Sequence, residues 1–441
     1  MSEATKPVAF LGLGAMGFGM ATHLVKNGFQ VTGFDVWGPT LERFKKEGGI
    51  GATTPAEAVE GKQHAVCMVA TAQQAQEALL DGPNPAVPAL PRGAVLLLCS
   101  TVSCGYVQGL AKQLEDIGRP DIQLIDCPVS GGAIRAGNGT LSIMAGAATP
   151  EAIENGRELL QALSDPKSLY IVQGVGAGSN MKMCHQVLAS VHILAAAEAM
   201  GLASHLGLDL PTAGKALVES EGSSWMLENR LPRILHPQFQ PLASAVTIIL
   251  KDTNIITSEA RRCGFATPMV STAEQGYFLG VGRGFGPDDD GSLLRLFIEG
   301  KGNVGPVKGT AETNEEKLKL VVDLLRGVHL SAVAECLAFS HRVGLDLDQV
   351  LELCVNAAGG SAILKRYGAD IIRVLRGEIL RGEGLRDIVV GLGEAVEEAH
   401  RLKAPLLLGT QAHLVLRLGL RHTAGPGDGS PAMAVKVWAI E

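Results

Sequence analysis

The feature that most constrains this 441-residue chain is a glycine-rich turn between two short apolar segments near the N-terminus. Residues Val8 to Leu11 form the first segment, the turn is Gly12-Leu13-Gly14-Ala15-Met16-Gly17, and the second segment ends at Asp35. Strand, G-x-G-x-x-G, helix, strand and acid, in that order, is the dinucleotide-binding pattern. The first glycine makes a tight turn, the second lets the backbone approach a pyrophosphate, and the third lets the helix pack on the strand. We therefore predict a Rossmann-like N-terminal domain.

Asp35 bears on the choice of dinucleotide. A carboxylate at this place can accept hydrogen bonds from the hydroxyls of the adenosine ribose, and it would repel a 2′-phosphate. Trp37, Gly38 and Pro39 follow, and the first arginine of the chain is Arg43. The sequence therefore favours NAD over NADP, with a solvated turn residue as the alternative for Asp35.

Short apolar segments and helical segments continue to alternate as far as residue 127. Strands are expected at 30–34, 65–70, 94–99 and 123–127, and helices at 18–26, 75–80 and 107–117. This alternation is typical of an α/β doubly wound sheet, in which ligands bind where the strands end. Two such ends carry Val69-Ala70-Thr71 and Ser100-Thr101, so we expect these residues near the cofactor.

Two later segments carry the candidate chemistry. Asp126 to Gly132 reads Asp-Cys-Pro-Val-Ser-Gly-Gly, and the N–H groups around Ser130, Gly131 and Gly132, with the Ser130 hydroxyl, can form a nest for a carboxylate. An ordinary glycine turn is the alternative.

The second segment is a long Ala/Leu-rich helix that begins after Gly176. Its first turns carry Lys182, His185 and Gln186, which share one face. A lysine near a helix N-terminus opposes the helix dipole, so its presence suggests an amine that exchanges a proton with a hydroxyl. A surface lysine is the alternative.

Four motifs in this order resemble those of the β-hydroxyacid dehydrogenase family, the relatives of 3-hydroxyisobutyrate dehydrogenase and 6-phosphogluconate dehydrogenase. They are GLGAMG at 12–17, DCPVSGGAIRAGNGTL at 126–141, GAGSNMKMCHQ at 176–186 and LKD at 250–252. The resemblance covers residues 6 to about 300. It looks strongest to the L-threonate dehydrogenase branch, because His-Gln stands where 3-hydroxyisobutyrate dehydrogenases have Asn-Asn and because 221–230 reads EGSSWMLENR.

The resemblance implies an NAD-dependent oxidoreductase that transfers a hydride between a small hydroxy acid and the nicotinamide. Lys182 matches the family's catalytic lysine, which takes the hydroxyl proton during oxidation and returns it during reduction. The longer Gln186 and the His185 imidazole suit a polyhydroxylated acid such as L-threonate. Implied substrate contacts are Ser130, Gly131, Gly132, His185, Gln186, Ser224 and Trp225. Implied cofactor contacts are Gly12, Leu13, Gly14, Ala15, Met16, Gly17, Asp35, Val69, Ala70, Thr101 and Lys251.

Two other functions stay open at this point. One is the reduction of a semialdehyde acid such as tartronate or methylmalonate semialdehyde. The other is a non-catalytic NAD-binding interaction protein, against which Lys182 argues, because family members with such roles tend to lack the lysine. The family's Leu-Pro cofactor segment is Val69-Ala70 here, so its proline is missing.

The 141 residues after Gly300 contain a second copy of the helical segment. Placing residues 182–210 over 319–347 without a gap gives 11 identities in 29 positions, where random matching would give about two. The matches include Lys182 with Lys319, His192 with His329 and Glu198 with Glu335. The second copy has no G-x-G-x-x-G in strand context and no Pro-Val-Ser-Gly-Gly, so we expect one cofactor site to serve both copies.

Residues of the second copy are expected to be structural. Val322-Asp323 replaces His185-Gln186, so we interpret Lys319 as a remnant or an ion-pair partner. His192 and His329 are interpreted as hydrogen-bonded core residues.

The predicted layout is a Rossmann domain at 1–173, an all-α domain at 174–300, a linker at 301–312 and a degenerate all-α copy at 313–441, an arrangement that resembles 6-phosphogluconate dehydrogenase. In shorter family members two subunits pair their helical domains around a dyad. We hypothesise that the second copy is an internal substitute for that partner, with a homodimer possible in addition.

Composition excludes several function classes. The chain has 38 Lys and Arg against 45 Asp and Glu, a net charge of −7, so it offers no basic footprint for nucleic acid or an anionic membrane. It shows no signal core and no run of about 18 uncharged apolar residues. The eight cysteines lack metal-ligand spacing, so we expect reduced, mostly buried thiols in a soluble cytoplasmic protein without a metal. The run Asp288-Asp289-Asp290 is expected to be a solvated loop.

Overall fold

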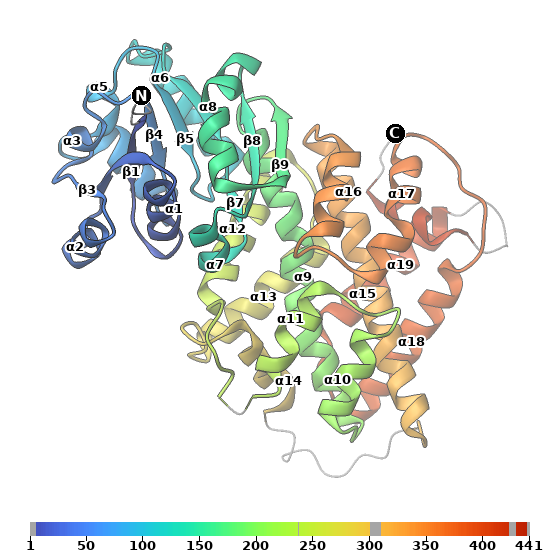
Figure 1. Cartoon of the computed structure of the whole chain (residues 1–441). Helices are drawn as coiled ribbons and strands as arrows, with labels where there is room; N and C mark the ends of the chain where they lie inside the picture. The colour runs from blue at the N-terminus through green and yellow to red at the C-terminus, as the bar shows by residue number, and fades with distance from the viewer. Residues whose placement is uncertain (1–5, 237, 300–309, 423–428, 439–441) are drawn as a thin grey trace. The chain divides into compact units, whose positions relative to one another are not determined.

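The computed structural model describes residues 6–236, 238–299, 310–422 and 429–438. The chain divides into two compact units, Met1–Lys182 and Met183–Glu441 (Figure 1). Most of the predicted linker, residues 301–309, lies outside the described residues.

The first unit is built on a nine-stranded sheet in the order β3-β2-β1-β4-β5-β6-β8-β7, with β9 beside β8. The strands are β1 Lys6–Leu11, β2 Phe29–Phe34, β3 Ile50–Gly51, β4 His64–Cys67, β5 Val95–Leu98, β6 Gln123–Asp126, β7 Val129–Ser130, β8 Leu141–Ala147 and β9 Ser164–Gln173. The strands β1 to β6 are parallel, and the strand order reverses between β1 and β4. This confirms the predicted doubly wound sheet. The antiparallel extension through β8 was not predicted.

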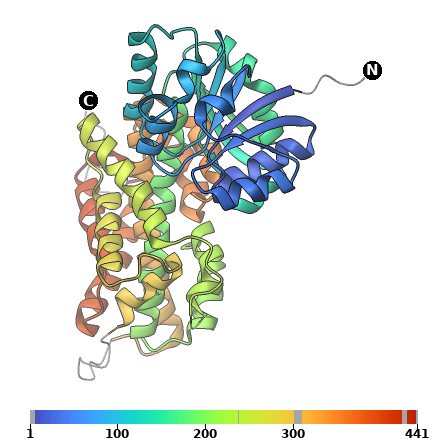
Figure 2. The ribbon, with the colours of Figure 1, turned by 90° about the vertical axis from the view of Figure 1, so that its left-hand side faces the viewer.

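Both faces of this sheet are covered by helices (Figure 2). Along β1, Val8 and Phe10 belong to one hydrophobic cluster, whereas Ala9 and Leu11 belong to another, because successive side chains of a strand point to opposite faces. The helices are α1 Ala15–Lys26, α2 Gly38–Lys46, α3 Pro55–Val59, α4 Ala72–Gln76, α5 Ala86–Ala89, α6 Cys104–Asp116, α7 Gly132–Asn138 and α8 Pro150–Leu163, and a π-helical turn, η1, spans Glu77–Asp81.

The second unit is helical, and its helices repeat. The first series is α9 Ala177–His205, which begins before the division, α10 Leu210–Val218, α11 Trp225–Ile234, α12 Val246–Cys263, α13 Pro268–Gly282, the 3-10 helix η2 Asp290–Leu294 and α14 Arg295–Ile298. The second is α15 Asn314–Arg342, α16 Leu347–Asn356, α17 Ala362–Leu375, α18 Leu385–Leu402, α19 Leu407–Gly419 and the 3-10 helices η4 Leu420–His422 and η5 Pro431–Val437.

The starts of α9, α10 and α11 recur at α15, α16 and α17 with the sequence offset of 137 that pairs Lys182 with Lys319. The helices α9 and α15 are both 29 residues long. The tail is therefore a second helical copy, as predicted.

Equivalent residues of the two copies meet each other, which places a pseudo-two-fold axis between them. Ser224 forms an antiparallel bridge with its counterpart Ser361. On either side of that bridge the Trp225 N–H donates to the Gly360 carbonyl at 2.8 Å and the Ala362 N–H donates to the Ser223 carbonyl at 3.0 Å. The donors of these two hydrogen bonds are separated by the offset of 137, and so are their acceptors, so the two copies are related as the halves of a dimer are.

Each copy also caps a helix of the other. The Glu198 carboxylate on α9 accepts hydrogen bonds from the N–H groups of Leu407, Leu408 and Gly409, at 2.7, 2.9 and 2.7 Å, where α19 begins. Its counterpart on α15 is Glu335, whose carboxylate accepts from Met269 and Val270 at 2.7 and 2.9 Å, where α13 begins. Burial raises the pKa of Glu198 to about 7 and that of Glu335 to about 8, while the N–H donors lower both. Buried acids thus join the two copies.

His192 and His329 pack on each other at the same pseudo-axis, with ring centroids 4.3 Å apart. Both are fully buried, as predicted. The prediction that they are hydrogen-bonded was wrong, since no ring nitrogen of either histidine has a hydrogen-bond partner among the described residues. The two rings are tilted by 57° to each other, and burial without a partner favours the neutral form of each imidazole. Burial lowers the pKa of His329 to about 3, and burial together with the neighbouring His329 and His185 lowers the pKa of His192.

We expect the second unit to lose stability as the pH falls below 6.5, the ordinary pKa of histidine. Because the folded pKa values are depressed, the unfolded chain binds more protons, so the stabilisation is complete above pH 6.5 and declines toward pH 3. His329 should contribute about 1 kcal/mol per pH unit over that interval, and His192 should act in the same direction. Melting temperatures from pH 7.5 to 5, compared between the wild type and a His192→Leu/His329→Leu protein, should show this slope in their difference, because the buried acids Glu198 and Glu335 change the stability of both proteins with the opposite sign. The same change at the exposed His341 of α15 should leave the pH dependence of the wild type intact.

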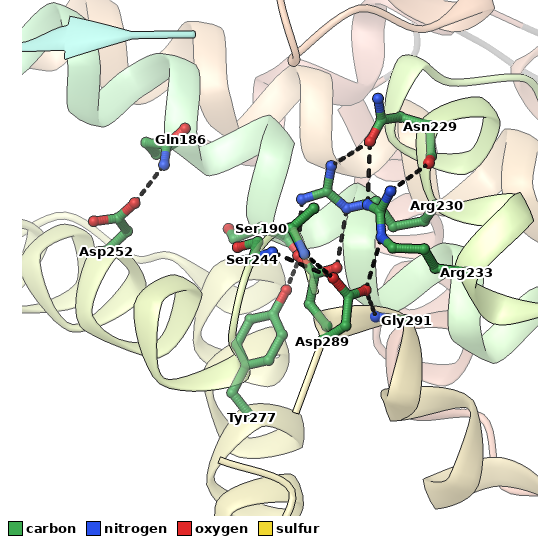
Figure 3. A network of polar contacts seen from close by, with 12 residues as sticks. Gln186, Ser190, Asn229, Arg230, Arg233, Ser244, Asp252, Tyr277, Asp289 and Gly291 are labelled. Carbon is green, nitrogen blue, oxygen red and sulfur yellow. Dashed lines mark hydrogen bonds and ion pairs between the residues drawn. The ribbon is translucent and has the colours of Figure 1, made fainter. Parts of the chain in front are cut away.

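The run Asp288-Asp289-Asp290 corrects another prediction. Asp289 and Asp290 are 2% and 1% exposed, not solvated. Asp289 accepts from Arg233 Nε at 2.9 Å, and Asp290 accepts from Arg230 at 3.0 and 2.8 Å, in the network that Figure 3 shows. Buried carboxylates need such partners, and here the partners come from α11. These acids therefore hold the start of η2 to α11.

Two further expectations concern burial. Seven of the eight cysteines are buried, Cys263 is half-buried, and none is in a disulfide. The sequence holds no run of about 18 uncharged apolar residues, but α9, whose apolar stretch is interrupted by Glu198, is long and apolar enough to cross a membrane by length and composition. Within the described residues 94% of that apolar window is buried inside the protein, as in the central helix of a helical core.

Candidate active site

The glycine loop begins where β1 ends. Gly12 has a φ of 95°, and a Cβ there would overlap the carbonyl of Met68. A Cβ on Gly17 would overlap the Gly12 carbonyl, whereas one on Gly14 would meet no atom within 4 Å. Gly12 is therefore required because the loop packs closely against the end of β4, and Gly17 because the loop packs closely on itself. Gly14 faces open space, where the sequence pattern expects a pyrophosphate.

Asp35 is tied to this loop. Its carboxylate accepts hydrogen bonds from the Leu13 N–H at 2.6 Å and from the Trp37 N–H at 2.8 Å. The second of these holds the turn that carries Val36 and Trp37, whose side chains are 90% and 65% exposed. The structure therefore gives Asp35 a task that the sequence did not indicate, because it braces the glycine loop from the end of β2.

Three further predicted cofactor residues, Val69, Ala70 and Thr101, follow the carboxyl ends of β4 and β5; β4 neighbours β1, and β5 neighbours β4. The Val69 N–H donates to the Ser100 hydroxyl at 2.9 Å, so these two strand ends are bonded to each other. Ala70 donates to the Gln74 side chain at 3.0 Å, and Thr101 is half-buried. The sheet thus brings the glycine loop, Val69, Ala70 and Thr101 to one edge.

The segment after β6 has the backbone that a glycine pair requires. Ser130 ends β7, and Gly131 and Gly132 have φ values of 139° and 72°, in the region that side-chain-bearing residues rarely adopt. Gly131 and Gly132 are exposed, and Ser130 is half-buried. The glycines are therefore needed for the turn itself, and the turn lies at an exposed position.

Lys182 stands on a helix whose first turn is locked to the sheet. The Asp126 carboxylate, at the end of β6, accepts from the Ser179 N–H at 2.6 Å and from the Ser179 hydroxyl at 2.7 Å. Gly178 packs so tightly that a Cβ would overlap the carbonyls of Asp126 and Met144. Lys182 follows Ser179 by one turn and is 6% exposed. Asp126 therefore sets the position of the helix that carries the predicted catalytic amine.

Sequence reasoning missed this role of Asp126, although its motif was recognised. Burial raises the pKa of Asp126 to about 7, against the opposing effect of its hydrogen bonds from Ser179. An acid directly after a buried strand was the available signal, but its partner lies 53 residues away.

Gln186 and Lys251 share a second missed acid, Asp252, and Figure 3 shows its contact with Gln186. Gln186 Nε2 donates to Asp252 Oδ2 at 2.5 Å, and Lys251 Nζ lies 3.3 Å from Asp252 Oδ1. Asp252 is 8% exposed, so its charge has little water around it. It thereby links a predicted substrate contact on α9 to a predicted cofactor contact on α12.

The remaining predicted substrate residues differ in their surroundings. His185 is fully buried and Trp225 is 42% exposed. Ser224 is 2% exposed and its hydroxyl accepts from the Leu227 N–H at 3.2 Å, as the N-cap of α11. The Ser224 hydroxyl therefore has a structural task, and its place in a substrate pocket stays a prediction.

Lys319, the counterpart of Lys182, differs from it. Its side chain is 64% exposed and its ammonium lies 2.6 Å from Asp323, which raises the pKa of the lysine. This confirms Lys319 as an ion-pair partner.

Comparison with known protein families gives the same division into an N-terminal nucleotide-binding domain and two helical copies. The family model for the NAD binding domain of 6-phosphogluconate dehydrogenase matches residues 7–176. The family model described as NAD-binding of NADP-dependent 3-hydroxyisobutyrate dehydrogenase matches twice, at residues 176–297 and 315–436. The second match falls on the predicted second copy.

Individual relatives are also named as dehydrogenases of hydroxy acids. The chain is 36% identical to an L-threonate dehydrogenase of Cupriavidus necator over 66% of this chain and 96% of that protein. It is 30% identical to the mitochondrial 3-hydroxyisobutyrate dehydrogenase of Mus musculus, over 68% and 89%. A solved 3-hydroxyisobutyrate dehydrogenase from Salmonella typhimurium matches with 31% identity and a TM-score of 0.59, over 66% of this chain and 100% of that one. The 6-phosphogluconate dehydrogenase of Plasmodium falciparum shares the fold over 94% and 92%, with a TM-score of 0.71 at 14% identity.

Proposed function

This chain belongs to the β-hydroxyacid dehydrogenase family, and we propose that it oxidises the hydroxyl of a small polyhydroxylated acid such as L-threonate. The protein is an NAD(P)-dependent dehydrogenase that acts on the CH–OH group of hydroxy acids. The observation that carries the finer proposal is the buried Lys182, one turn beyond the Asp126–Ser179 lock and one turn before Gln186. The likeness to proteins named L-threonate dehydrogenase supports the substrate class.

In the proposed mechanism, Lys182 in its neutral form accepts the proton of the substrate hydroxyl at Nζ while the C–OH group becomes a carbonyl. In the reverse direction the ammonium returns that proton. The Ser130 hydroxyl and the N–H groups of Gly131 and Gly132 hold the substrate carboxylate, and Gln186, held by Asp252, orients the hydroxyls. The bound dinucleotide supplies the hydride acceptor.

The residues at the sheet edge fit such a dinucleotide. Gly14 leaves open space at the start of α1, and the Asp35 carboxylate stands at the end of β2, beside the loop. Within the family we propose NAD over NADP, because a 2′-phosphate near Asp35 would meet a negative charge.

Replacing Asp35 tests that preference. We expect Asp35→Ala to raise the KM for NAD about 10-fold, the scale of one or two hydrogen bonds. The kcat/KM with NAD divided by the kcat/KM with NADP should fall by a larger factor. Asp35→Asn keeps an acceptor for the Leu13 N–H but lacks the charge, so it should narrow the ratio with a smaller change in KM for NAD. An unchanged ratio in both variants would show that Asp35 only braces the loop.

The decisive experiment is a panel of aldonates, including L-threonate, and of semialdehyde acids, assayed with NAD and with NADP. Oxidation of an aldonate with NAD supports the proposal. Preferred reduction of tartronate or methylmalonate semialdehyde would replace it by the second candidate, which uses the same residues in reverse and is favoured by the likeness to 3-hydroxyisobutyrate dehydrogenases. Activity with neither class would refute both.

We also infer that the second helical copy takes the place of a partner subunit, because the copies meet around a pseudo-two-fold axis through Ser224 and Ser361. The predicted domain limits, 1–173, 174–300 and 313–441, are kept as part of this proposal. A soluble cytoplasmic location is proposed with it.

A further inference from the structure

Arg135 lies on α7 against the glycine pair of the proposed carboxylate site. A Cβ placed on Gly131 would be 2.9 Å from both Cβ and Cδ of Arg135 and 3.3 Å from its Nε. The aliphatic part of the arginine therefore runs along the Gly131 backbone, in the space that any side chain at position 131 would fill. Gly131 thus serves two purposes, the turn and the close approach of a guanidinium.

The guanidinium is held in one orientation. Arg135 Nε donates to the Thr140 carbonyl at 2.6 Å, and Thr140 directly precedes β8, which is paired on both sides by β7 and β9. Fixing Nε fixes the plane of the guanidinium, since the group is rigid. Among the residues that the structure describes, no carboxylate lies within ion-pair distance of Arg135, and the side chain is half-buried. A fixed cation without an internal counter-charge is suited to an anion from outside.

We propose that Arg135 is a substrate-binding residue that pairs with the carboxylate of the hydroxy acid. This rests on the proposed function, because it assumes that the carboxylate lies at Ser130, Gly131 and Gly132. Backbone N–H groups supply only partial charges, whereas a guanidinium supplies a full charge and two parallel donors that match a carboxylate. The site would then select substrates by their anionic group, and neutral polyols or esters of the same carbon skeleton would be poor substrates.

The test is Arg135→Ala, compared with Arg157→Ala, an arginine on α8 of the same unit that pairs with Glu154. For the hydroxy acid that the wild type turns over, Arg135→Ala should raise KM about 10- to 100-fold, the scale of one charge-assisted hydrogen bond, with kcat and the KM for NAD little changed. For the methyl ester of that acid the change should be under a few-fold. Arg157→Ala should leave all these constants unchanged. Millimolar guanidinium should partly restore the KM of Arg135→Ala for the acid.

Other outcomes would overturn the proposal. An equal loss for acid and ester, or a raised KM for NAD, would mean that Arg135 only shapes the loop, and an unchanged KM for the acid would mean that it has no part in binding. Calorimetric titration of L-threonate into the wild type and into Arg135→Ala separates this from the proposed function. If the wild type binds L-threonate but oxidises none of the panel, the proposed reaction is refuted. The role of Arg135 is then judged separately, by whether Arg135→Ala binds L-threonate more weakly than the wild type does.

Discussion

Replacing Lys182 by alanine should lower turnover by at least ~100-fold, the usual scale of general acid/base help, while the affinity for NAD stays nearly the same. The amine is the proposed proton acceptor, and without it the hydroxyl proton must go to water. The fold should survive the change, because Asp126 holds the first turn of α9 through Ser179. The proposed cofactor residues lie elsewhere, chiefly at Gly12–Gly17 and Asp35. Steady-state kinetics and NAD titration give both quantities.

The chain contains a matched control for this prediction. Lys319 occupies the equivalent position of the second copy, and its exposed ammonium pairs with Asp323. Lys319→Ala should keep the full turnover. If Lys182→Ala also kept it, the proposed mechanism would be wrong. If both variants lost turnover together, the lysines would be acting through stability, which the melting temperatures would reveal.

The second large effect is expected at the reciprocal caps. Glu198→Ala leaves two buried N–H groups and one half-buried N–H group at the start of α19 without their acceptor, and Glu335→Ala leaves two buried ones at the start of α13. An unsatisfied buried group costs about 1–3 kcal/mol, so each variant should lose roughly 3 kcal/mol or more of unfolding free energy. For a unit of this size that corresponds to a fall in Tm of about 5–10 °C. Calorimetric scans of the single and double variants measure it.

Glutamine at the same positions provides the control. Glu198→Gln and Glu335→Gln keep one acceptor oxygen and the side-chain volume, so they should lose clearly less than the alanine variants. A Tm unchanged by alanine at both positions would contradict the inference that these acids join the copies.

The same acids should set the alkaline limit of stability. Their folded pKa values of about 7 and about 8 lie above the ordinary 4.5, so the folded protein holds the protons more tightly than the unfolded chain does. The stabilisation is complete below pH 4.5 and is lost as the pH rises through 7 to 8, opposite in sign to that of His192 and His329.

Local pattern was sufficient for much of the fold. Apolar runs bounded by glycines predicted β1, β2 and the parallel core, and the offset between Lys182 and Lys319 predicted the second series of helices. Such features are visible in sequence because each depends on residues that are close together or that repeat at one fixed distance.

What could not be predicted depends on partners far apart in the chain. Asp289 was expected in water, since the arginine that accommodates its charge lies 56 residues earlier. Asp126 and Asp252 were present in recognised motifs, yet their bonds to Ser179 and Gln186 span 53 and 66 residues. An isolated acid in a sequence carries no sign of its partner, so the positioning groups of the site were missed, whereas the residues proposed to contact ligands could be named from their motifs and remain predictions.

The pseudo-two-fold axis has a consequence for how this protein tolerates mutation and dilution. In a dimer of identical chains, one codon changes both sides of the contact, and the contact itself is lost when the subunits separate at low concentration. Here the two sides of the Ser224–Ser361 contact are encoded separately and remain on one chain. One side has therefore been free to lose its active-site residues, and the helix that carries Lys182 keeps its packing partner however few molecules are present.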